Sequence, residues 1–423
     1  MLLHILKIIR TELRSNLWVL AELLVVSVVL WISIDYFSAQ YQLYHKPVGY
    51  ETEHVYEAVV SMKSVESPSF ITYEQGSEEP YQNFSRIIER IRQHPDVESV
   101  AIASYSLPYT YSNRTYGVQK DTTLAWQSVR MLSVSPEYFR VFHITPANGG
   151  SPEELGERLR QEETMISATL AEELFGRTNV VGEKLFYVYD SVPKTISAVT
   201  EAIRNDEYDD RSAYNIFQLL TLEEMARQGS SEKDYHDLQV IFRTRANVPT
   251  QDFADKFLNE MRQQLKAGNY WVSDIQSYDT IRKDFLARSS NASGQQVMSS
   301  VIVFLLVNVF LALIGTFWFH VNRRREEIGL RMAIGSSRNG ILCFFISEGL
   351  LLLTLSMIPA LLICLNLLSA EVIANHATTS VFGRFCAVSL ATWIVLAITI
   401  LIAVWYPARK ASGMNPADAL HYE

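Results

Sequence analysis

Four long apolar runs constrain the fold of this 423-residue chain more than any other feature of its sequence. A helix needs about 20 predominantly apolar residues to cross the roughly 30 Å of hydrocarbon in a bilayer. The runs reach or approach this length, and polar sequence borders each of them. We therefore predict four transmembrane helices, over residues 17–34, 296–320, 341–368 and 385–406.

The first run has a competing interpretation, because a basic segment precedes it as it would precede a secretory signal peptide. Against a signal peptide, the run is long and no small-residue cleavage site closes it cleanly; residues 38–40 come nearest. Glu22 also lies inside the run, which suits a helix packed in a bundle better than a signal sequence. We expect an uncleaved helix.

A large acidic domain is predicted between the first two helices, over residues 35–295. This stretch holds 38 acidic and 26 basic residues, so it carries about −12 of formal charge, while the whole chain carries −9. An acidic surface disfavours nucleic acid as a partner, since phosphate binding needs a basic patch. The stretch has no cysteine, so its stability must come from a buried core and not from disulfides.

The loop charges predict the orientation in the membrane, because positive residues accumulate on the cytoplasmic side. Basic residues gather before the first helix, between the second and third, and after the fourth, as Lys7, Arg10, Arg14, Arg323, Arg324, Arg325, Arg331, Arg338, Arg409 and Lys410. We expect residues 1–16, 321–340 and 407–423, including both termini, to be cytoplasmic. The domain and the short loop 369–384 are then extracytoplasmic.

The sequence predicts a mixture of α-helices and β-strands in the acidic domain. Phe84, Ile87, Ile88 and Ile91 follow helical spacing and predict an amphipathic helix that Pro95 stops. A second helix is expected over 168–175, with Ser167 as its cap and Gly176 at its end, and a third over 253–265, closed by Gly268. Short strands are expected over 97–103, 185–189, 195–199, 238–243 and 270–275. Such units suggest small α+β subdomains.

The sequence lacks the familiar catalytic motifs. The nearest approach to a phosphate-binding Walker A loop is 176–184, but the spacing is wrong and neither Ser nor Thr follows Lys184. No serine-hydrolase, zinc-protease or dinucleotide-binding pattern occurs, and the nine histidines are scattered. We expect a non-catalytic subunit that binds no cofactor or metal itself.

The cytoplasmic segment 323–337 mixes charge with apolar residues. A solvated basic loop would explain the arginines, but not the apolar side chains or the two glycines within it. In a helix, one face would carry Glu327, Leu330, Arg331 and Ile334. An amphipathic helix that docks to a cytoplasmic partner accounts for both sets. The residues predicted to couple to this partner are Glu327, Ile328, Gly329, Leu330, Arg331, Ala333, Ile334 and Gly335.

This segment resembles the signature R-x-x-E-I-G-L-R-x-A-x-G-A of MacB/LolC/FtsX-type ABC permeases, matched over 324–336 with Ser336 in place of Ala. The C-terminal signature of that family is matched by Pro407, Ala408, Ala411, Pro416, Ala419 and Leu420. In the outer domain, 134–139 resembles the V-S-x-x-Y-F element of the MacB-like periplasmic core, and 171–176 resembles A-x-x-L-F-G. A G-R-x-F element usual in the family is missing, and the acidic stretch 146–163 stands there instead.

The resemblance implies a fold, partners and a location. It implies a membrane protein with four transmembrane helices arranged 1+3, and a large α+β extracytoplasmic domain inserted between the first and second. It implies a bacterial inner-membrane location and pairing with a second copy or a paralogue. A separate cytoplasmic ABC ATPase, which binds ATP and Mg²⁺, is the implied energy source. A periplasmic adaptor or a lipoprotein is an implied further partner.

Two functions remain open at this stage. The first is an export or extraction permease acting on small molecules, peptides or lipoproteins outside the inner membrane. The second is an FtsX-like signal transmitter that regulates an extracytoplasmic partner such as a cell-wall hydrolase; the large outer domain favours the first. Only Glu22 and Glu348 are acidic within the predicted helices, which are few for an ion pathway. Glu348 either reaches the cytoplasmic headgroups or pairs with an arginine of the docking segment, such as Arg331.

Overall fold

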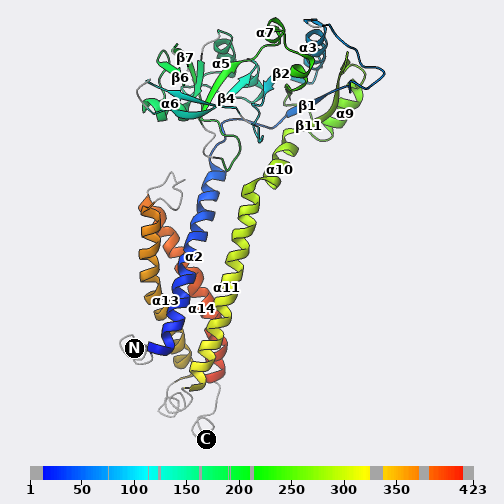
Figure 1. Ribbon diagram of the computed structural model, residues 1–423. Helices are drawn as coiled ribbons and strands as arrows, with labels where there is room; N and C mark the ends of the chain where they lie inside the picture. Colours follow the sequence, from blue (N-terminus) through cyan, green and yellow to red (C-terminus); the bar gives the residue numbers. More distant parts are fainter. Residues whose placement is uncertain are drawn as a thin grey trace. The chain divides into compact units, whose positions relative to one another are not determined.

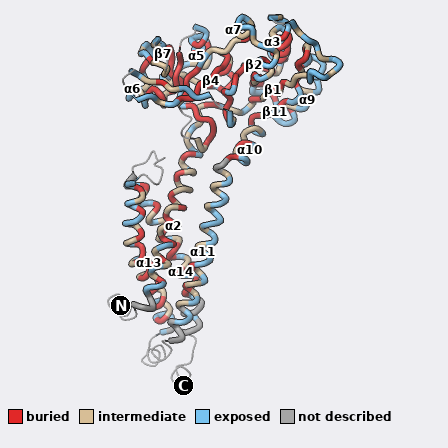
Figure 2. Tube along the Cα trace, viewed as in Figure 1, coloured by how far each residue is buried: buried red, intermediate tan, exposed pale blue. Residues whose placement is uncertain are grey.

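The computed structural model describes residues 13–74, 76–112, 114–121, 125–161, 164–188, 190, 192–209, 214–323, 337–370 and 381–412. The chain divides into two compact units, which are described separately. One unit contains residues 1–44 and 290–423, and the other contains His45–Ser289. Figure 1 shows the elements of both units, and Figure 2 shows how far each residue is buried.

The helical unit contains four long helices, α2 (Leu13–His45), α11 (Ser290–Arg323), α13 (Arg338–Ser369) and α14 (Val381–Ser412). Each contains a stretch apolar enough to cross a membrane, over Leu17–His45, Ala292–Thr316, Asn339–Ser369 and Phe382–Trp405. The predicted arrangement of one such helix, an inserted domain and three further helices is confirmed. Helix α13 continues through Pro359 without a break.

The first helix differs from its prediction at the C-terminal end. Sequence placed the start of the outer domain at residue 35, whereas α2 continues to His45. The charge of Asp35 suggested that the apolar run ends there. In the structure Asp35 is buried and paired with Arg384 of α14, so the helix passes through it. A carboxylate with a buried partner does not need to reach water.

The second unit is built on one eleven-stranded sheet within the described residues. Five strands form its first part, in the order β10 (Lys266–Ala267), β11 (Tyr270–Ser277), β1 (Val55–Met62), β9 (Gln239–Thr244) and β2 (Val97–Ser104). Neighbouring strands in this part are antiparallel. The sheet continues from β2 through Ala103 and Ser104 into β4 (Gln127–Val134).

The remaining strands close into a ring. From β4 the order continues through β3 (Arg114–Gln119), β6 (Lys184–Tyr187), β7 (Lys194–Thr200), β5 (Thr164–Ser167) and β8 (Asn215–Leu219). β8 then pairs with β4 in parallel, which completes a six-stranded barrel. Its interior holds the side chains of Val118, Val129, Ile166, Leu185, Ile196 and Ile216. The predicted α+β class is confirmed, but the strands belong to one continuous sheet.

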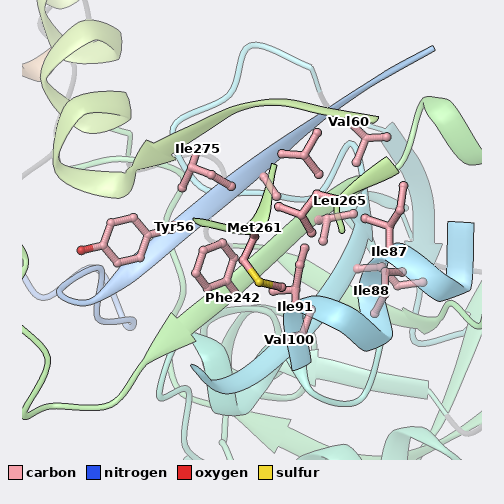
Figure 3. Close-up of a cluster of buried hydrophobic side chains, with 14 of the residues drawn as sticks. Tyr56, Val60, Ile87, Ile88, Ile91, Val100, Phe242, Met261, Leu265 and Ile275 are labelled. Carbon is pink, nitrogen blue, oxygen red and sulfur yellow. The ribbon is translucent and has the colours of Figure 1, made fainter. Parts of the chain in front are cut away.

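Helices cover the five-stranded part on the face shown in Figure 3. Helix α3 (Glu79–Arg92) packs Phe84, Ile87, Ile88 and Ile91 against this face, as their spacing predicted. Complete burial of each such side chain contributes about 1.5–3 kcal/mol. The same core includes residues of α7 (Leu222–Arg227), α8 (Glu232–His236) and α9 (Phe253–Met261).

One predicted helix boundary changes, and one predicted side-chain cap is not formed. Helix α9 ends at Met261, and Gly268 lies instead in the turn between β10 and β11, with φ of +59°. A Cβ at Gly268 would lie 2.4 Å from Asn83 Nδ2, so glycine fits both the turn and the close contact. Helix α6 (Ala168–Phe175) ends at a left-handed Gly176, as predicted. The Ser167 side chain does not cap α6 and accepts instead from the Asn215 backbone N–H.

The opposite face of the sheet packs against α4 (Tyr138–Val141), α5 (Pro152–Leu159) and α10 (Tyr278–Arg288). Tyr138 and Phe139, from the V-S-x-x-Y-F element, are completely buried here, and the Tyr138 hydroxyl donates to the Ser106 carbonyl at 3.0 Å. Tyr278 and Phe285 of α10 join the same core. Helix α10 directly precedes α11, so this core reaches the point where the chain leaves the domain.

Candidate coupling site

The predicted docking residues, Glu327, Ile328, Gly329, Leu330, Arg331, Ala333, Ile334 and Gly335, lie outside the described residues. Their role therefore stays a prediction. The two predicted polar residues of the spans are described. Glu22 is partly buried on α2, and Glu348 on α13 is completely buried. A completely buried carboxylate is enclosed by neighbouring helices, which does not fit a side chain reaching toward headgroups.

Loop 203–209 is where the two ends of the domain meet, and its second residue is Arg204. Arg204 is 4% exposed, and its guanidinium donates to three backbone carbonyls. Its Nη1 donates to the Glu207 carbonyl at 2.9 Å, its Nε to the Pro47 carbonyl at 3.3 Å, and its Nη2 to the Lys46 carbonyl. Residues 46 and 47 directly follow α2. Arg204 thus fixes the segment through which the chain enters the domain.

Glu207 binds the segment through which the chain leaves the domain. Its Oε1 accepts from Arg282 Nε of α10 at 2.5 Å and from the Tyr109 hydroxyl at 2.9 Å. The Glu207 side chain is 8% exposed and that of Arg282 is 30% exposed, so the carboxylate of this ion pair is largely shielded from water. Hydrogen bonds to a charged, shielded group are among the stronger ones in proteins. Glu207 thus ties α10 to the same loop that holds residues 46 and 47.

Buried tyrosines complete this site. The Tyr50 hydroxyl donates to the Asn205 carbonyl at 3.1 Å, and its ring lies edge-to-face against Tyr109. Burial raises the pKa of Tyr50 and of Tyr109 well above their ordinary values, so both phenols stay protonated and act as donors. The Tyr111 ring packs at a tilt against Phe285 of α10, with ring centroids 4.6 Å apart. Together, loop 203–209, residues 46–50, Tyr109 and α10 form what we call the base site.

Sequence reasoning missed the base site. The segment Arg204-Asn205-Asp206-Glu207 is polar and lies between two predicted strands, so it resembles an exposed loop. The structure buries all four residues. Desolvation raises the pKa of Asp206, whose carboxylate accepts from the Tyr208 N–H at 2.8 Å. The one sequence signal was the density of opposite charges within four residues, which is also what a solvated loop shows.

Sequence reasoning also missed a polar seam inside the helical unit. Arg384 Nε lies 2.6 Å from Asp35 Oδ1, and Nη2 contacts Oδ2, so the two side chains pair through two hydrogen bonds. The side chains of Asp35 and Arg384 are 1% and 3% exposed. One helical turn away, Trp31 Nε1 donates to Ser389 Oγ at 3.1 Å. Both contacts join α2 to α14 across more than 340 residues of sequence.

A groove of about 1240 Å³ crosses the domain between α3, α7, β2 and the barrel strands. Three pairs of opposite charge line it: Arg92 with Glu89, Arg160 with Glu137, and Arg227 with Glu224. Asp190, Lys194 and Glu223 line the groove as well, so five acidic and four basic side chains give it a net formal charge of −1. The groove therefore suits a ligand without strong net charge. Within the described residues, no group of three or more His, Cys, Asp or Glu side chains is arranged to hold a metal ion.

Comparison with known proteins identifies two family regions in this chain. Residues 52–259 match the MacB-like periplasmic core domain, and residues 299–416 match the FtsX-like permease C-terminal region. The first region lies within the unit that contains the base site. The second begins inside α11 and includes α13 and α14.

Individual relatives agree with these matches. A macrolide export ATP-binding/permease protein MacB from Bdellovibrio bacteriovorus is 25% identical over 336 residues, covering 74% of this chain and 45% of that protein. The corresponding protein of Vibrio parahaemolyticus is 24% identical over 329 residues, covering 77% and 46%. The chain therefore spans less than half the length of these relatives. The crystal structure of the periplasmic region of MacB from Actinobacillus actinomycetemcomitans aligns with 59% of this chain at 11% identity and a TM-score of 0.33.

Proposed function

Because the chain belongs to the MacB/FtsX type of ABC permeases, we propose that it converts ATP hydrolysis by a cytoplasmic ATPase into movement of its extracytoplasmic domain. The ATPase, with its ATP and Mg²⁺, is a separate chain in this proposal. The base site is the observation that carries the proposal. Both connections of the domain to the helical unit, residues 46–47 and α10, bond to the same loop, 203–209. A displacement of either connection therefore acts on one buried element of the domain.

The path of this coupling follows the order of the chain. The ATPase docks on segment 323–337, which directly follows α11. Movement of α11 is passed along the chain to α10, and from α10 through Arg282 to Glu207. Loop 203–209 contacts the sheet through Asn215 of β8, whose Nδ2 donates to the Ile203 carbonyl at 2.7 Å. The proposed orientation has both termini in the cytoplasm and the domain in the periplasm, with the chain in the bacterial inner membrane.

The work proposed for the domain is export or extraction of small molecules, peptides or lipoproteins outside the membrane. The curated relatives named above are macrolide export proteins, and the groove suits a ligand without strong net charge. A second permease copy or a paralogue completes the assembly, together with a periplasmic adaptor or a lipoprotein. The alternative is an FtsX-like transmitter that regulates an extracytoplasmic partner such as a cell-wall hydrolase. Co-purification distinguishes them, since an adaptor or lipoprotein supports export and a hydrolase supports regulation.

Truncation of the docking segment tests the proposed ATPase. Leu330→Ala with Ile334→Ala removes two apolar anchors from one predicted helix face, and loss of a buried anchor often costs about 2 kcal/mol or more. We expect this double variant to insert normally but to lose its ATPase on purification. Arg338→Ala, at the start of α13, is the matched control and should retain the ATPase. If the double variant keeps the wild-type amount of ATPase, the segment is not the docking site.

A further inference from the structure

Strand β2 has an open edge inside the groove of the domain. Within the described residues, β2 pairs with β9 along most of its length but with β4 only at its last two residues. The pairing with β4 ends after Ser135, whose N–H donates to the Ile102 carbonyl at 2.9 Å. In the same register Glu137 would lie opposite Val100, but Glu137 already has helical dihedral angles, with φ of −70° and ψ of −13°, because α4 begins there.

The backbone of Val100 faces this open edge. Alternate residues of an antiparallel strand bond to opposite neighbours. Ile102 bonds on the β4 side, where its carbonyl accepts from the Ser135 N–H and its own N–H donates to Ser135 Oγ at 3.1 Å. Val100, two residues earlier, therefore presents its N–H and carbonyl on the same side. Among the described residues neither group has a hydrogen-bond partner on that side, and Val100 lines the groove.

Strand β9 leads to the same assignment. The Thr244 N–H, at the end of β9, donates to the His54 carbonyl beside β1 at 2.9 Å. Alternate residues of β9 therefore bond toward β1, and the residues between them, such as Ile241, bond toward β2. Ile241 lies opposite Ala101 in the register of the two strands. Ala101 thus bonds to β9, and Val100 does not.

The chemistry of the groove fits an extended peptide better than another ligand. A strand edge with one free donor and one free acceptor on the same residue matches what a residue of another extended chain offers. The groove volume of about 1240 Å³ is larger than the roughly 300–1,000 Å³ usual for small-molecule pockets. Its net formal charge is −1, and its lining includes the apolar or aromatic side chains of Tyr116, Tyr187, Leu219 and Leu220. Neutral side chains of a peptide would find contacts there.

We propose that the groove binds an extended peptide with neutral side chains, which adds to β2 as a short strand and exchanges two hydrogen bonds with the backbone of Val100. The Val100 side chain packs in the core with Ile88 and Ile91 (Figure 3), so the peptide meets backbone at this position. Backbone pairing tolerates many peptide sequences. This inference rests on the proposed export function and names peptides as its substrates. Binding itself needs no ATPase, so it can fail while ATPase coupling stands.

Peptides with alternating backbone methylation test the pairing, on the full chain in detergent without the ATPase. The probe is dye-labelled Thr-Val-Thr-Val-Thr-amide, followed by fluorescence anisotropy. Two versions carry N-methyl groups, one on the valines and the other on the threonines. Alternate residues of an extended chain face opposite edges, so one version should lose about tenfold or more in affinity and the other should bind like the parent peptide. Equal affinities of the two versions overturn strand addition. Absence of parent binding overturns the proposal, and binding of the macrolide erythromycin in its place leaves export as the function.

Amide exchange and a pair of variants locate the site. Saturating parent peptide should slow exchange of the Val100 amide about tenfold or more, and leave that of Ala101 unchanged. Val100→Pro removes the N–H, which proline permits at an open strand edge, and should weaken peptide binding about tenfold or more. Val100→Ala keeps the N–H and is the matched control that should bind like the wild type. Unchanged Val100 exchange overturns the site, as does wild-type affinity in Val100→Pro; exchange alone decides if that variant does not fold.

Discussion

Replacement of Glu207 by Gln tests how firmly α10 is held at the base site. The glutamine keeps the size and an acceptor oxygen for Arg282 Nε and the Tyr109 hydroxyl, but it removes the charge. A hydrogen bond to a charged group contributes about 1.5–3 kcal/mol, and a neutral one about 0.5–1.5 kcal/mol. Arg282 keeps its charge but loses its counter-charge, while the Tyr109 bond becomes a neutral one, so the two bonds together should weaken by about 1.4 kcal/mol. That difference corresponds to roughly a tenfold larger population of states in which α10 is locally open.

Hydrogen exchange on the full chain in detergent measures this opening. The amides of residues 281–288 should exchange about tenfold faster in Glu207→Gln, whereas amides of α3 should not change. Glu224→Gln is the control, because Glu224 pairs with Arg227 on the surface, where the side chains are 50% and 75% exposed. A surface pair contributes about 0–1 kcal/mol, so its loss should leave exchange in α10 unaltered. Unchanged exchange of α10 in Glu207→Gln would refute the role assigned to this carboxylate.

Three further predictions follow from individual side chains. Burial raises the pKa of Glu57 to about 7 from an ordinary 4.5, so the folded chain holds this proton more tightly than the unfolded chain, and stability is lost as pH rises from about 4.5 to 7. Glu57→Gln should therefore raise the free energy of unfolding at pH 8 by at most roughly 3 kcal/mol and leave it unchanged at pH 4, as thermal unfolding at each pH would measure. Equal effects at both pH values would contradict this. A cysteine at Ser77 should react with an impermeant thiol reagent from outside intact cells, and one at the exposed Asn339 only after permeabilisation, whereas labelling of position 339 in intact cells would reverse the orientation. Glu348→Gln should insert normally but weaken ATPase coupling, and unchanged transport-linked ATPase activity would argue that the buried carboxylate is only structural.

The core of the domain was predictable where the spacing of apolar residues along one element indicates which of its faces is buried. Phe84, Ile87, Ile88 and Ile91 lie on one side of any helix, so their spacing alone indicates which face of α3 is covered. The strand predicted over 97–103 is β2 for the same kind of reason. Closure of the barrel was not predictable, because the parallel pairing of β8 with β4 joins strands about 85 residues apart through backbone hydrogen bonds that any sequence can make.

The candidate sites show the same difference between features that depend on local sequence and features that depend on partners distant in the sequence. The four spans follow from the sequence alone, since apolar composition over the required length is a local property. Asp35 with Arg384, and Glu207 with Arg282, depend on partners that the sequence does not indicate, at separations of 349 and 75 residues. From the sequence alone, Asp35 indicates the border of the domain and Glu207 indicates a solvated loop. In the folded chain both carboxylates are shielded from water. Sequence thus determined which segments leave water, and only the tertiary structure decided which charges leave water with them, because a buried charge is tolerated only where packing brings its partner.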